Sequence, residues 1–274
     1  MQTTSWLAAA VQLSSGEDVE RNVAEAEALV RNAARLGARF VALPENFAYL
    51  RVRPDAPEVR IGLDHPVVVR MQALARELGI DLVLGSIPEP SAVAGKVHNT
   101  SVYIDSAGAV RGTYRKLHLF DIDIPGAVSA RESDTITPGA EPCLVGSDLG
   151  PIGLSICYDL RFPELYRRLR ADGARVLLVP AAFTLHTGKD HWFPLLRARA
   201  IENQCWVVAP AQYGTHGPGR STYGKATIID PWGLPVATAR DGVGLCLAEI
   251  DYDHQDRIRA GLPCHGHRHK VFWG

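Results

Sequence analysis

The chain has 274 residues, of which 46% are apolar and 22% are charged, and its formal net charge is -1. This length is enough for a substantial core, and the near-zero charge gives no indication of a nucleic-acid or membrane partner. No apolar run approaches the roughly 18 residues that a membrane span needs. The chain has five cysteines, an odd number, and no CxxC motif, so a disulfide framework or zinc site is not expected. We expect free thiols in a reducing compartment such as the cytoplasm.

Short apolar runs alternate with amphipathic stretches along the whole chain, beginning with AVQL, which we interpret as part of a first strand and not of a signal peptide. The β-branched, apolar composition of several runs is typical of strands buried on both faces. Strands are predicted at residues 7–13, 40–43, 82–87, 100–105, 152–157, 176–179, 206–211, 226–230 and 244–250. Helices are predicted at residues 19–36, 67–78, 163–171 and 191–204.

The long stretch 121–141 has few periodic apolar residues and contains two Pro-Gly pairs, so it is predicted to be a large loop over one end of a sheet. No repeat and no low-complexity linker divides the chain. We therefore predict one domain of α/β class over residues 1–274, with a C-terminal arm from about residue 251 to 274.

The segment GLSICYDLRFPELYR contains the first candidate for chemistry, because its run of strand formers ends at Cys157 and a helix follows. A nucleophile on such a strand-to-helix turn is exposed at the end of the sheet, near backbone N–H groups that can bind an oxyanion. The nearby helix N-terminus also favours a thiolate. Local sequence equally allows Cys157 to be a buried core residue.

Two further segments carry charged residues beside apolar runs. In LPENF, Glu45 follows a predicted strand, where burial would raise its pKa and make it a better base, although it could also be a solvated turn residue. In TYRKLHLF, Lys116 is either extended to solvent or held near a carboxylate. Arg115 and His118 are close to Lys116 in the sequence, and composition alone does not show which of the three basic residues takes part in the chemistry.

Together these segments resemble the signature blocks of the nitrilase superfamily of carbon–nitrogen hydrolases. LPEN, YRKLHLF and GLSICYDLRFPELYR occur in that order, with gaps of 71 and 41 residues between Glu45, Lys116 and Cys157. The resemblance extends from AVQL to the DPWG turn and beyond, so it covers nearly the whole chain.

The resemblance implies a catalytic set of Glu45 as base, Lys116 as oxyanion stabiliser, Cys157 as nucleophile and a second glutamate, Glu132, in RESDTITPG. It implies a four-layer α-β-β-α sandwich (the nitrilase fold) that assembles as a homodimer. The expected chemistry is amide hydrolysis through a thioester, with a small-molecule amide as substrate and with no metal or organic cofactor.

The segment AFTLHTGKDHWFPLLRARAIENQ resembles the branch that contains the ω-amidases and the deaminated glutathione amidases, and RARAIENQCWVVAPAQ is more similar to the latter. Both substrates carry a 2-oxoglutaryl group. The resemblance implies that Phe183 and Thr187 line the acyl pocket, and Tyr158 supplies an oxyanion N–H. Arg161 is the expected carboxylate clamp, because its fork matches a carboxylate, with a structural pair to Glu164 or Asp159 as the alternative.

The leaving-group side is expected in residues 121–131 and 213–223, and Tyr49 is a weaker candidate for the pocket border. In the tail CHGHRHK, His265, His267 and His269 could share one face, but we interpret the tail as a surface or dimer-contact arm and not as a metal site. The leading hypothesis is hydrolysis of deaminated glutathione. The alternatives are an ω-amidase acting on 2-oxoglutaramate, another amidase, a nitrilase or carbamoyl-amide hydrolase, and a non-catalytic scaffold.

Overall fold

The computed structural model describes residues 4–53, 55–126, 128–217, 219–269 and 271. Residues 270 and 272–274 of the predicted arm lie outside this range, as do the first three residues. The helices are α1 (Val19–Arg35), α2 (Pro66–Leu78), α3 (Pro163–Ala171), α4 (Leu185–Asn203) and α5 (Tyr252–Gly261), with short 3-10 helices η1 (Glu132–Asp134) and η2 (Cys157–Arg161).

Three sheets contain the described strands. The eight-stranded sheet is ordered β13-β12-β1-β2-β3-β4-β5, with β16 paired antiparallel to β1 along Ser5–Gln12. The six-stranded sheet is ordered β15-β14-β11-β10-β9-β8. Strands β6 and β7 form a separate hairpin. The strands are β1 (Ser5–Leu13), β2 (Phe40–Ala42), β3 (Asp81–Pro90), β4 (Val97–Ile104), β5 (Val110–Arg115), β6 (Asp121–Ile124), β7 (Val128–Arg131), β8 (Cys143–Ser147), β9 (Gly150–Leu154), β10 (Val176–Leu178), β11 (Trp206–Ala209), β12 (Ala211–Gly217), β13 (Arg220–Tyr223), β14 (Thr227–Ile229), β15 (Pro235–Thr238) and β16 (Gly244–Asp251).

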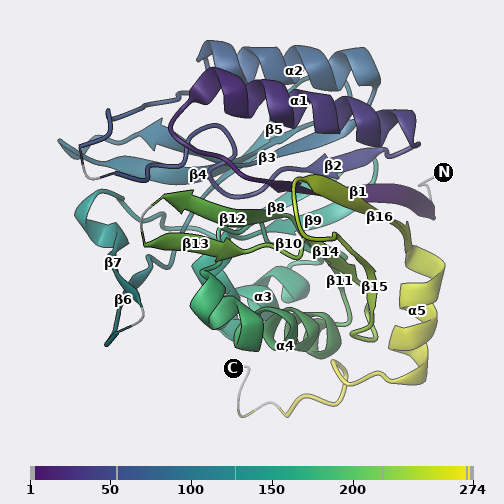
Figure 1. Cartoon of the computed structure of the whole chain (residues 1–274). Helices are drawn as coiled ribbons and strands as arrows, with labels where there is room; N and C mark the ends of the chain where they lie inside the picture. Colours follow the sequence, from purple (N-terminus) through teal and green to yellow (C-terminus); the bar gives the residue numbers. More distant parts are fainter. Residues whose placement is uncertain (1–3, 54, 127, 218, 270, 272–274) are drawn as a thin grey trace.

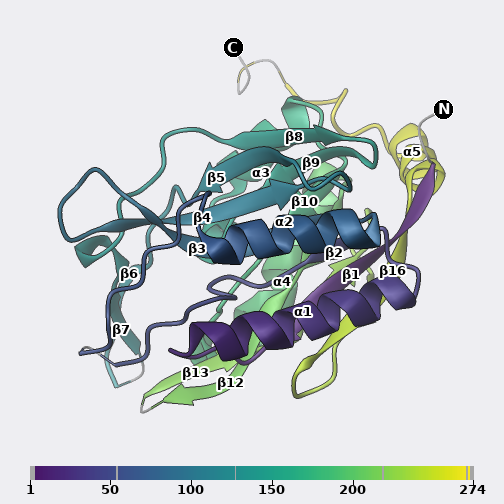
Figure 2. The same cartoon turned by 90° about the horizontal axis from the view of Figure 1, so that it is seen from above.

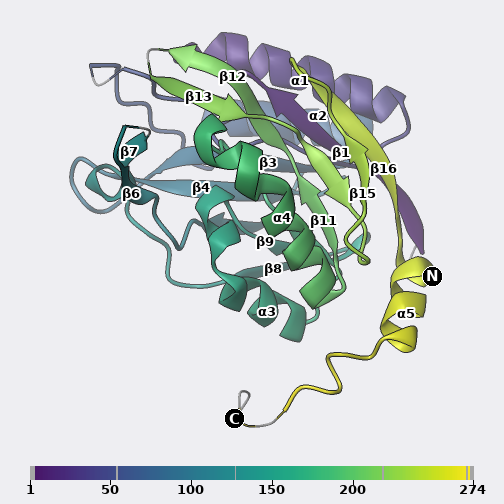
Figure 3. The same ribbon diagram turned by 60° about the horizontal axis from the view of Figure 1, so that its bottom comes forward.

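The two large sheets pack face to face between two helical layers, which confirms the predicted four-layer α-β-β-α sandwich. Figures 1 and 2 show α1 and α2 over the outer face of the eight-stranded sheet. Figure 3 shows α3 and α4 side by side on the outer face of the six-stranded sheet. Strand β1 explains the layering, because Ala8 and Ala10 join the core between the sheets while Ala9 and Val11 join the core beneath α1 and α2.

The helix boundaries follow local sequence signals. Asp18 caps α1 by accepting a hydrogen bond from the Arg21 N–H, and α2 ends at Gly79, whose φ is 64°. Helix α3 begins at Pro163, where the missing N–H costs nothing. Among the described helices, none combines the length and apolar character needed to cross a bilayer.

Several predicted boundaries are wrong. Stretch 121–141 is not simply a loop, because β6 pairs with β7 and η1 follows. The short alternation DIDI, with exposed Asp and half-buried Ile residues, was the available signal. The predicted strand 206–211 is two strands in different sheets, because the chain crosses from β11 to β12 at Pro210, which has no N–H for a ladder. Helix α4 begins six residues before the predicted start.

Candidate active site

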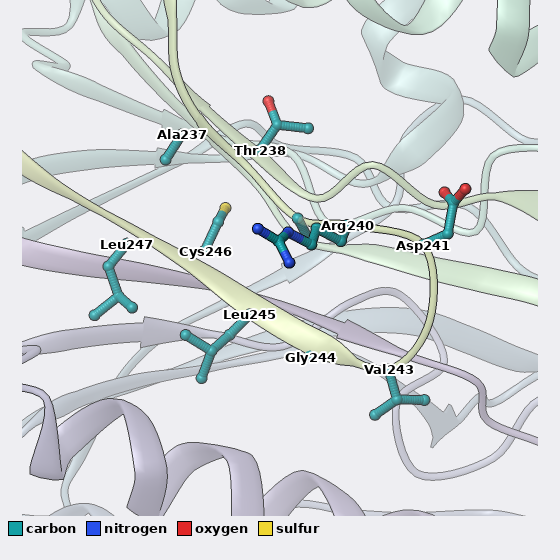
Figure 4. Close-up of a pocket in the computed structure, with 10 residues that line it drawn as sticks. Ala237, Thr238, Arg240, Asp241, Val243, Gly244, Leu245, Cys246 and Leu247 are labelled. Atoms are coloured by element: carbon teal, nitrogen blue, oxygen red, sulfur yellow. The ribbon is translucent and has the colours of Figure 1, made fainter.

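The structure contains two notable cavities, and the smaller one lacks the groups that hydrolysis needs. It holds about 440 Å³ between β15 and β16 (Figure 4). Its one thiol, on Cys246, donates to the Ala226 carbonyl at 3.3 Å, and burial raises the pKa of that thiol to about 12. Arg240 and Asp241 are the charged residues of its described wall. A buried thiol in this setting is a structural residue.

The larger cavity holds about 1140 Å³ and contains the predicted catalytic residues. Glu45, Lys116, Glu132 and Cys157 all line it, although they come from segments far apart in the sequence. Strands β2 and β9 belong to different sheets, so the site lies where the chain leaves the ends of both sheets. This is the position at which α/β folds commonly bind ligands.

Cys157 lies on a sharp turn that directly follows β9. Its φ is 47°, in the left-handed region that non-glycine residues seldom adopt, so the turn holds it in a strained conformation. The Cys157 N–H donates to the Pro180 carbonyl at 2.9 Å. Among the described residues outside the turn, the Tyr158 N–H has no acceptor. That N–H is therefore available to bind an oxyanion beside the sulfur.

Glu45 is placed by a close approach between two strands. A Cβ on Gly85 of β3 would lie 2.0 Å from the Leu43 carbonyl oxygen, so glycine lets β3 pass beneath the Leu43–Glu45 segment. The Asn46 N–H then donates to the Ser86 hydroxyl at 2.9 Å. Glu45 is 3% exposed, which rules out the solvated turn that its local sequence allowed.

Lys116 lies between the two glutamates. Its Nζ is 3.0 Å from Glu45 Oε1 and 2.9 Å from Glu132 Oε2, and Lys116 is 2% exposed. Glu132 Oε2 also accepts the Phe120 N–H at 2.6 Å, so its orientation is fixed. The structure thus selects between the predicted alternatives for Lys116, which is held by carboxylates and does not extend to solvent.

The charges of the site favour the thiol form of Cys157. Burial alone would raise the pKa of Glu45, but the Lys116 ammonium and hydrogen bonds from Cys157, Lys116 and Ala182 outweigh it, and the pKa is lowered. The predicted increase is therefore wrong in sign. Burial and the Glu45 charge raise the pKa of Cys157 well above its ordinary value. Burial opposes the charge of Lys116, yet Glu132 and Glu45 raise its pKa.

Asn99 is a site residue that sequence reasoning missed. Its Nδ2 donates to Glu45 Oε1 at 2.9 Å and to Glu132 Oε1 at 3.2 Å. The backbone carbonyl oxygen of Asn99 accepts the Lys116 N–H at 2.9 Å, so β4 also positions the lysine backbone. The available signal was a polar HNTS stretch beside a predicted strand, which the pattern of apolar residues does not explain.

Asp159 is the second missed residue, and it is fully buried two positions after the nucleophile. Its carboxylate accepts from the Ile156 N–H at 2.8 Å, the His118 N–H at 3.1 Å and the Tyr114 hydroxyl at 2.7 Å. His118 Nδ1 lies 2.7 Å from the same carboxylate. Asp159 therefore ties the turn that carries Cys157 to the segment that carries Lys116 and is not a partner of Arg161.

The predicted acyl-pocket residues divide into two groups. Tyr158, Phe183, Thr187 and Tyr49 line the cavity. Arg161 is not among the lining residues; its guanidinium carbon lies 5.7 Å from the Tyr158 ring centroid and 5.2 Å from that of Phe183. Arg161 Nη1 is 3.3 Å from His191 Nδ1. Its role as a carboxylate clamp stays a prediction.

Both segments predicted for the leaving-group side contribute to the cavity wall, through Arg131 of the first and Arg220 and Thr222 of the second, among others. Their role in specificity stays a prediction. Within the described ranges, no three His, Cys, Asp or Glu side chains are grouped as a metal site requires.

Comparison with known proteins gives a consistent result. Residues 7–260 match the family model described as carbon–nitrogen hydrolase. The chain is 45% identical over 266 residues to a deaminated glutathione amidase of Synechocystis, covering 96% of this chain and 98% of that protein. It is 43% identical to the human deaminated glutathione amidase, covering 98% and 84%. The crystal structure of the C. elegans NitFhit protein superposes with a TM-score of 0.92 at 40% identity, covering 100% of this chain and 67% of that one.

Proposed function

The chain belongs to the carbon–nitrogen hydrolase family and is a hydrolase of amide carbon–nitrogen bonds, and from this premise we propose that Cys157 is its nucleophile. Glu45 is the general base, Lys116 the oxyanion stabiliser and Glu132 the residue that orients Lys116. The supporting observation is the hydrogen-bonded set itself, in which Glu45 contacts both the Cys157 thiol and the Lys116 ammonium.

Acylation follows from the protonation states of the site. As the Cys157 sulfur attacks the amide carbon, its proton passes to Glu45 and the carbonyl π electrons move to oxygen. The Lys116 ammonium and the Tyr158 N–H stabilise the resulting oxyanion. The oxyanion then collapses, the carbon–nitrogen bond breaks, and the amine leaves with the proton returned by Glu45. The product is a thioester on Cys157.

Deacylation uses the same groups in the same order. Glu45 takes a proton from a water molecule as the water oxygen attacks the thioester carbon. The second oxyanion occupies the same donors, and its collapse expels the Cys157 sulfur, which regains the proton from Glu45. A carboxylic acid is released and the thiol is restored. Glu132 remains ionised and holds the ammonium of Lys116 in place through both steps.

The proposed substrate is deaminated glutathione, cleaved to 2-oxoglutarate and cysteinylglycine. The near-full-length relatives at 42–45% identity that bear this name support the assignment. Phe183 and Thr187 supply the acyl pocket. Arg161, which lies over the Tyr158 and Phe183 rings, is proposed to bind the carboxylate of the acyl group. The cavity of about 1140 Å³ has room for a peptide leaving group beyond the acyl chain.

The test is a comparison of two substrates by their products. Purified protein is assayed on deaminated glutathione and on 2-oxoglutaramate, with 2-oxoglutarate, cysteinylglycine and ammonia measured separately. A kcat/KM at least tenfold higher on the tripeptide supports the proposal. Preference for 2-oxoglutaramate would instead make the protein an ω-amidase with the same mechanism.

The chain is further proposed to be one cytoplasmic domain that forms a homodimer. Ile201, Trp232, Leu234 and Val236 are 48%, 63%, 59% and 43% exposed. A Cβ on Gly233 would touch Ile201 at 2.4 Å, so the turn between β14 and β15 lies against α4 and these side chains form one apolar surface. The C-terminal arm is proposed to lie beside this surface.

The free thiols of the described cysteines support the proposed cytoplasmic location, because the cytoplasm is a reducing compartment.

A further inference from the structure

The cavity has a positively charged region that the catalytic mechanism does not use. Apart from Lys116, its walls include four cationic residues, namely Arg51, Arg131, Lys189 and Arg220. Glu58 also lines the cavity, but it forms an ion pair with Arg60 at 2.7 Å. Cations around a confined site attract an anionic ligand, so this region indicates a charged group on the substrate.

Arg220 is anchored by one side-chain hydrogen bond and keeps most of its donors unused. It lies at the start of β13, and its Nη1 donates to the Arg51 carbonyl oxygen at 2.5 Å. Among the described residues, this is the one hydrogen bond that the Arg220 side chain makes, and no described carboxylate forms an ion pair with its guanidinium. A guanidinium carries five N–H donors in a planar fork, so the remaining donors are available to a carboxylate.

The electrostatic surroundings of Arg220 connect it to the catalytic groups. The Arg220 side chain is exposed at the cavity wall, yet desolvation by the surrounding residues lowers its pKa, while the charges of Glu45, Cys157 and Glu132 partly oppose that change. Arg220, Glu45, Glu132 and Cys157 all line the same cavity. Because Lys116 neutralises one of the two glutamates, the alternative role of Arg220 is to balance the remaining charge. A comparison of substrates with and without a terminal carboxylate separates the two roles.

Strand β13 leads from the Phe183 segment to Arg220, because the Tyr223 N–H at the end of this strand donates to the Phe183 carbonyl at 2.9 Å. Phe183 and Thr187, which the proposed function assigns to the acyl group, lie at the start of α4. Arg220 instead extends to the backbone of Arg51, in the loop between β2 and α2. A substrate whose acyl group lies against Phe183 therefore has its leaving group free to extend toward Arg220.

We propose that Arg220 binds the free terminal carboxylate of a peptide leaving group, while Arg51 and Arg131 add positive charge to the same cavity. The inference rests on the proposed function and identifies the leaving group as a small peptide with a free C-terminal carboxylate. Ammonia has no such group, so a simple amide gains nothing from this subsite. The subsite thereby selects the tripeptide over 2-oxoglutaramate, because the two substrates share their acyl group.

The test uses three substrates and two variants. The substrates are deaminated glutathione, its C-terminal carboxamide analogue and 2-oxoglutaramate. The wild-type protein should prefer the acid to the carboxamide by about ten- to a hundredfold in kcat/KM, as expected for charge-assisted hydrogen bonds. Arg220→Gln should reduce that ratio to about one by lowering kcat/KM on the acid, while turnover of the other two substrates stays within about twofold. Arg111→Gln is the matched control. Arg111 lies on β5 outside the cavity wall, and its guanidinium pairs with the Asp105 carboxylate.

Two results would overturn the proposal. An equal loss on all three substrates in Arg220→Gln would show that Arg220 balances charge or supports folding. A wild-type protein that does not distinguish the acid from the carboxamide would reject the subsite without using any variant. If the wild-type protein hydrolyses 2-oxoglutaramate but not deaminated glutathione, the proposed substrate itself is wrong, and that failure is visible before any variant is measured.

Discussion

At the scale of single residues, the two carboxylate oxygens of Glu45 have different partners. Oε1 accepts from Lys116 and Asn99, whereas Oε2 accepts from the Ala182 N–H at 2.7 Å. Because two donors occupy Oε1, Oε2 is the oxygen available to the Cys157 thiol. In the proposed mechanism, Asn99 is therefore a positioning residue that fixes which oxygen of Glu45 acts as the base.

Replacement of Asn99 by leucine should shift the pH dependence of the reaction. An N–H donor stabilises the ionised form of Glu45, so its loss raises the Glu45 pKa. The carboxylate then becomes protonated at a higher pH, and the acid limb of the kcat/KM profile moves upward. We expect a loss of about ten- to a hundredfold near neutral pH, measured from pH profiles of wild type and Asn99→Leu.

Ser101→Ala is the control for this variant, because Ser101 is equally buried two residues along β4 and its hydroxyl has no partner among the described residues. Its profile should match that of the wild type. An Asn99→Leu profile that keeps its acid limb, with reduced height alone, would contradict the positioning role.

The sequence predicts the positions of Glu45, Lys116 and Cys157 because the three signature segments are ordered and distinctive. It does not predict Asn99 or Asp159, because their contacts join residues that are far apart in the sequence. Asn99 contacts Glu132, 33 positions away, and Asp159 contacts His118, 41 positions away. Nor does it predict the direction of the Glu45 pKa shift. That direction depends on the distance between Glu45 and Lys116, which the fold decides.

At the scale of elements, Asp159 connects η2 to the segment that follows β5. Its carboxylate accepts two backbone N–H groups, one from each segment, and the Tyr114 hydroxyl. Burial and the Asp159 charge raise the pKa of Tyr114 well above its ordinary range, so this hydroxyl stays a donor. One buried carboxylate therefore holds the segments of Cys157 and Lys116, the proposed nucleophile and oxyanion stabiliser, in position relative to each other.

Replacement of Asp159 by asparagine should lower both stability and activity. The amide keeps the shape but replaces one acceptor oxygen by a donor, which faces N–H and O–H groups that also donate. We expect the free energy of unfolding to fall by about 2–4 kcal/mol, measured by urea denaturation. Asp253→Asn, at an exposed position of α5, should leave it within about 0.5 kcal/mol. Equal stability of the two variants would refute the connecting role of Asp159.

The elements that the sequence predicts well are those with a clear period. Helix α3 has the predicted bounds, and α1 ends one residue before the predicted end. Helix α4 begins early because Gly188 and several polar residues precede its apolar part, which conceals the helical period. Strand β13 and helix α5 were not predicted, because their positions depend on pairing or packing with distant parts of the chain.

At the scale of the whole molecule, the alternation of strands and helices predicts an α/β class but not the number of layers. The division into two sheets depends on the crossing at Pro210, which local patterns do not reveal. The resemblance of the signature segments supplied the four-layer arrangement, and the packing of the two cores confirms it.

The proposed dimer can be tested through its exposed apolar surface. Trp232→Glu introduces a charge into that surface, and burying an unpaired charge is strongly unfavourable. We expect the wild type to have the mass of a dimer by light scattering and the variant to shift toward the mass of a monomer. Val69→Glu, at an exposed position of α2, is the control and should leave the mass unchanged. A monomeric wild type would reject the dimer.

The central claim is that Cys157 performs the hydrolysis, and the most direct measurement is the rate of 2-oxoglutarate release from deaminated glutathione by wild type and Cys157→Ala. Loss of the nucleophile should lower the rate by at least about a thousandfold. Cys205→Ala, which removes a buried thiol outside the larger cavity, should keep activity. Turnover by Cys157→Ala at the wild-type rate would contradict the mechanism.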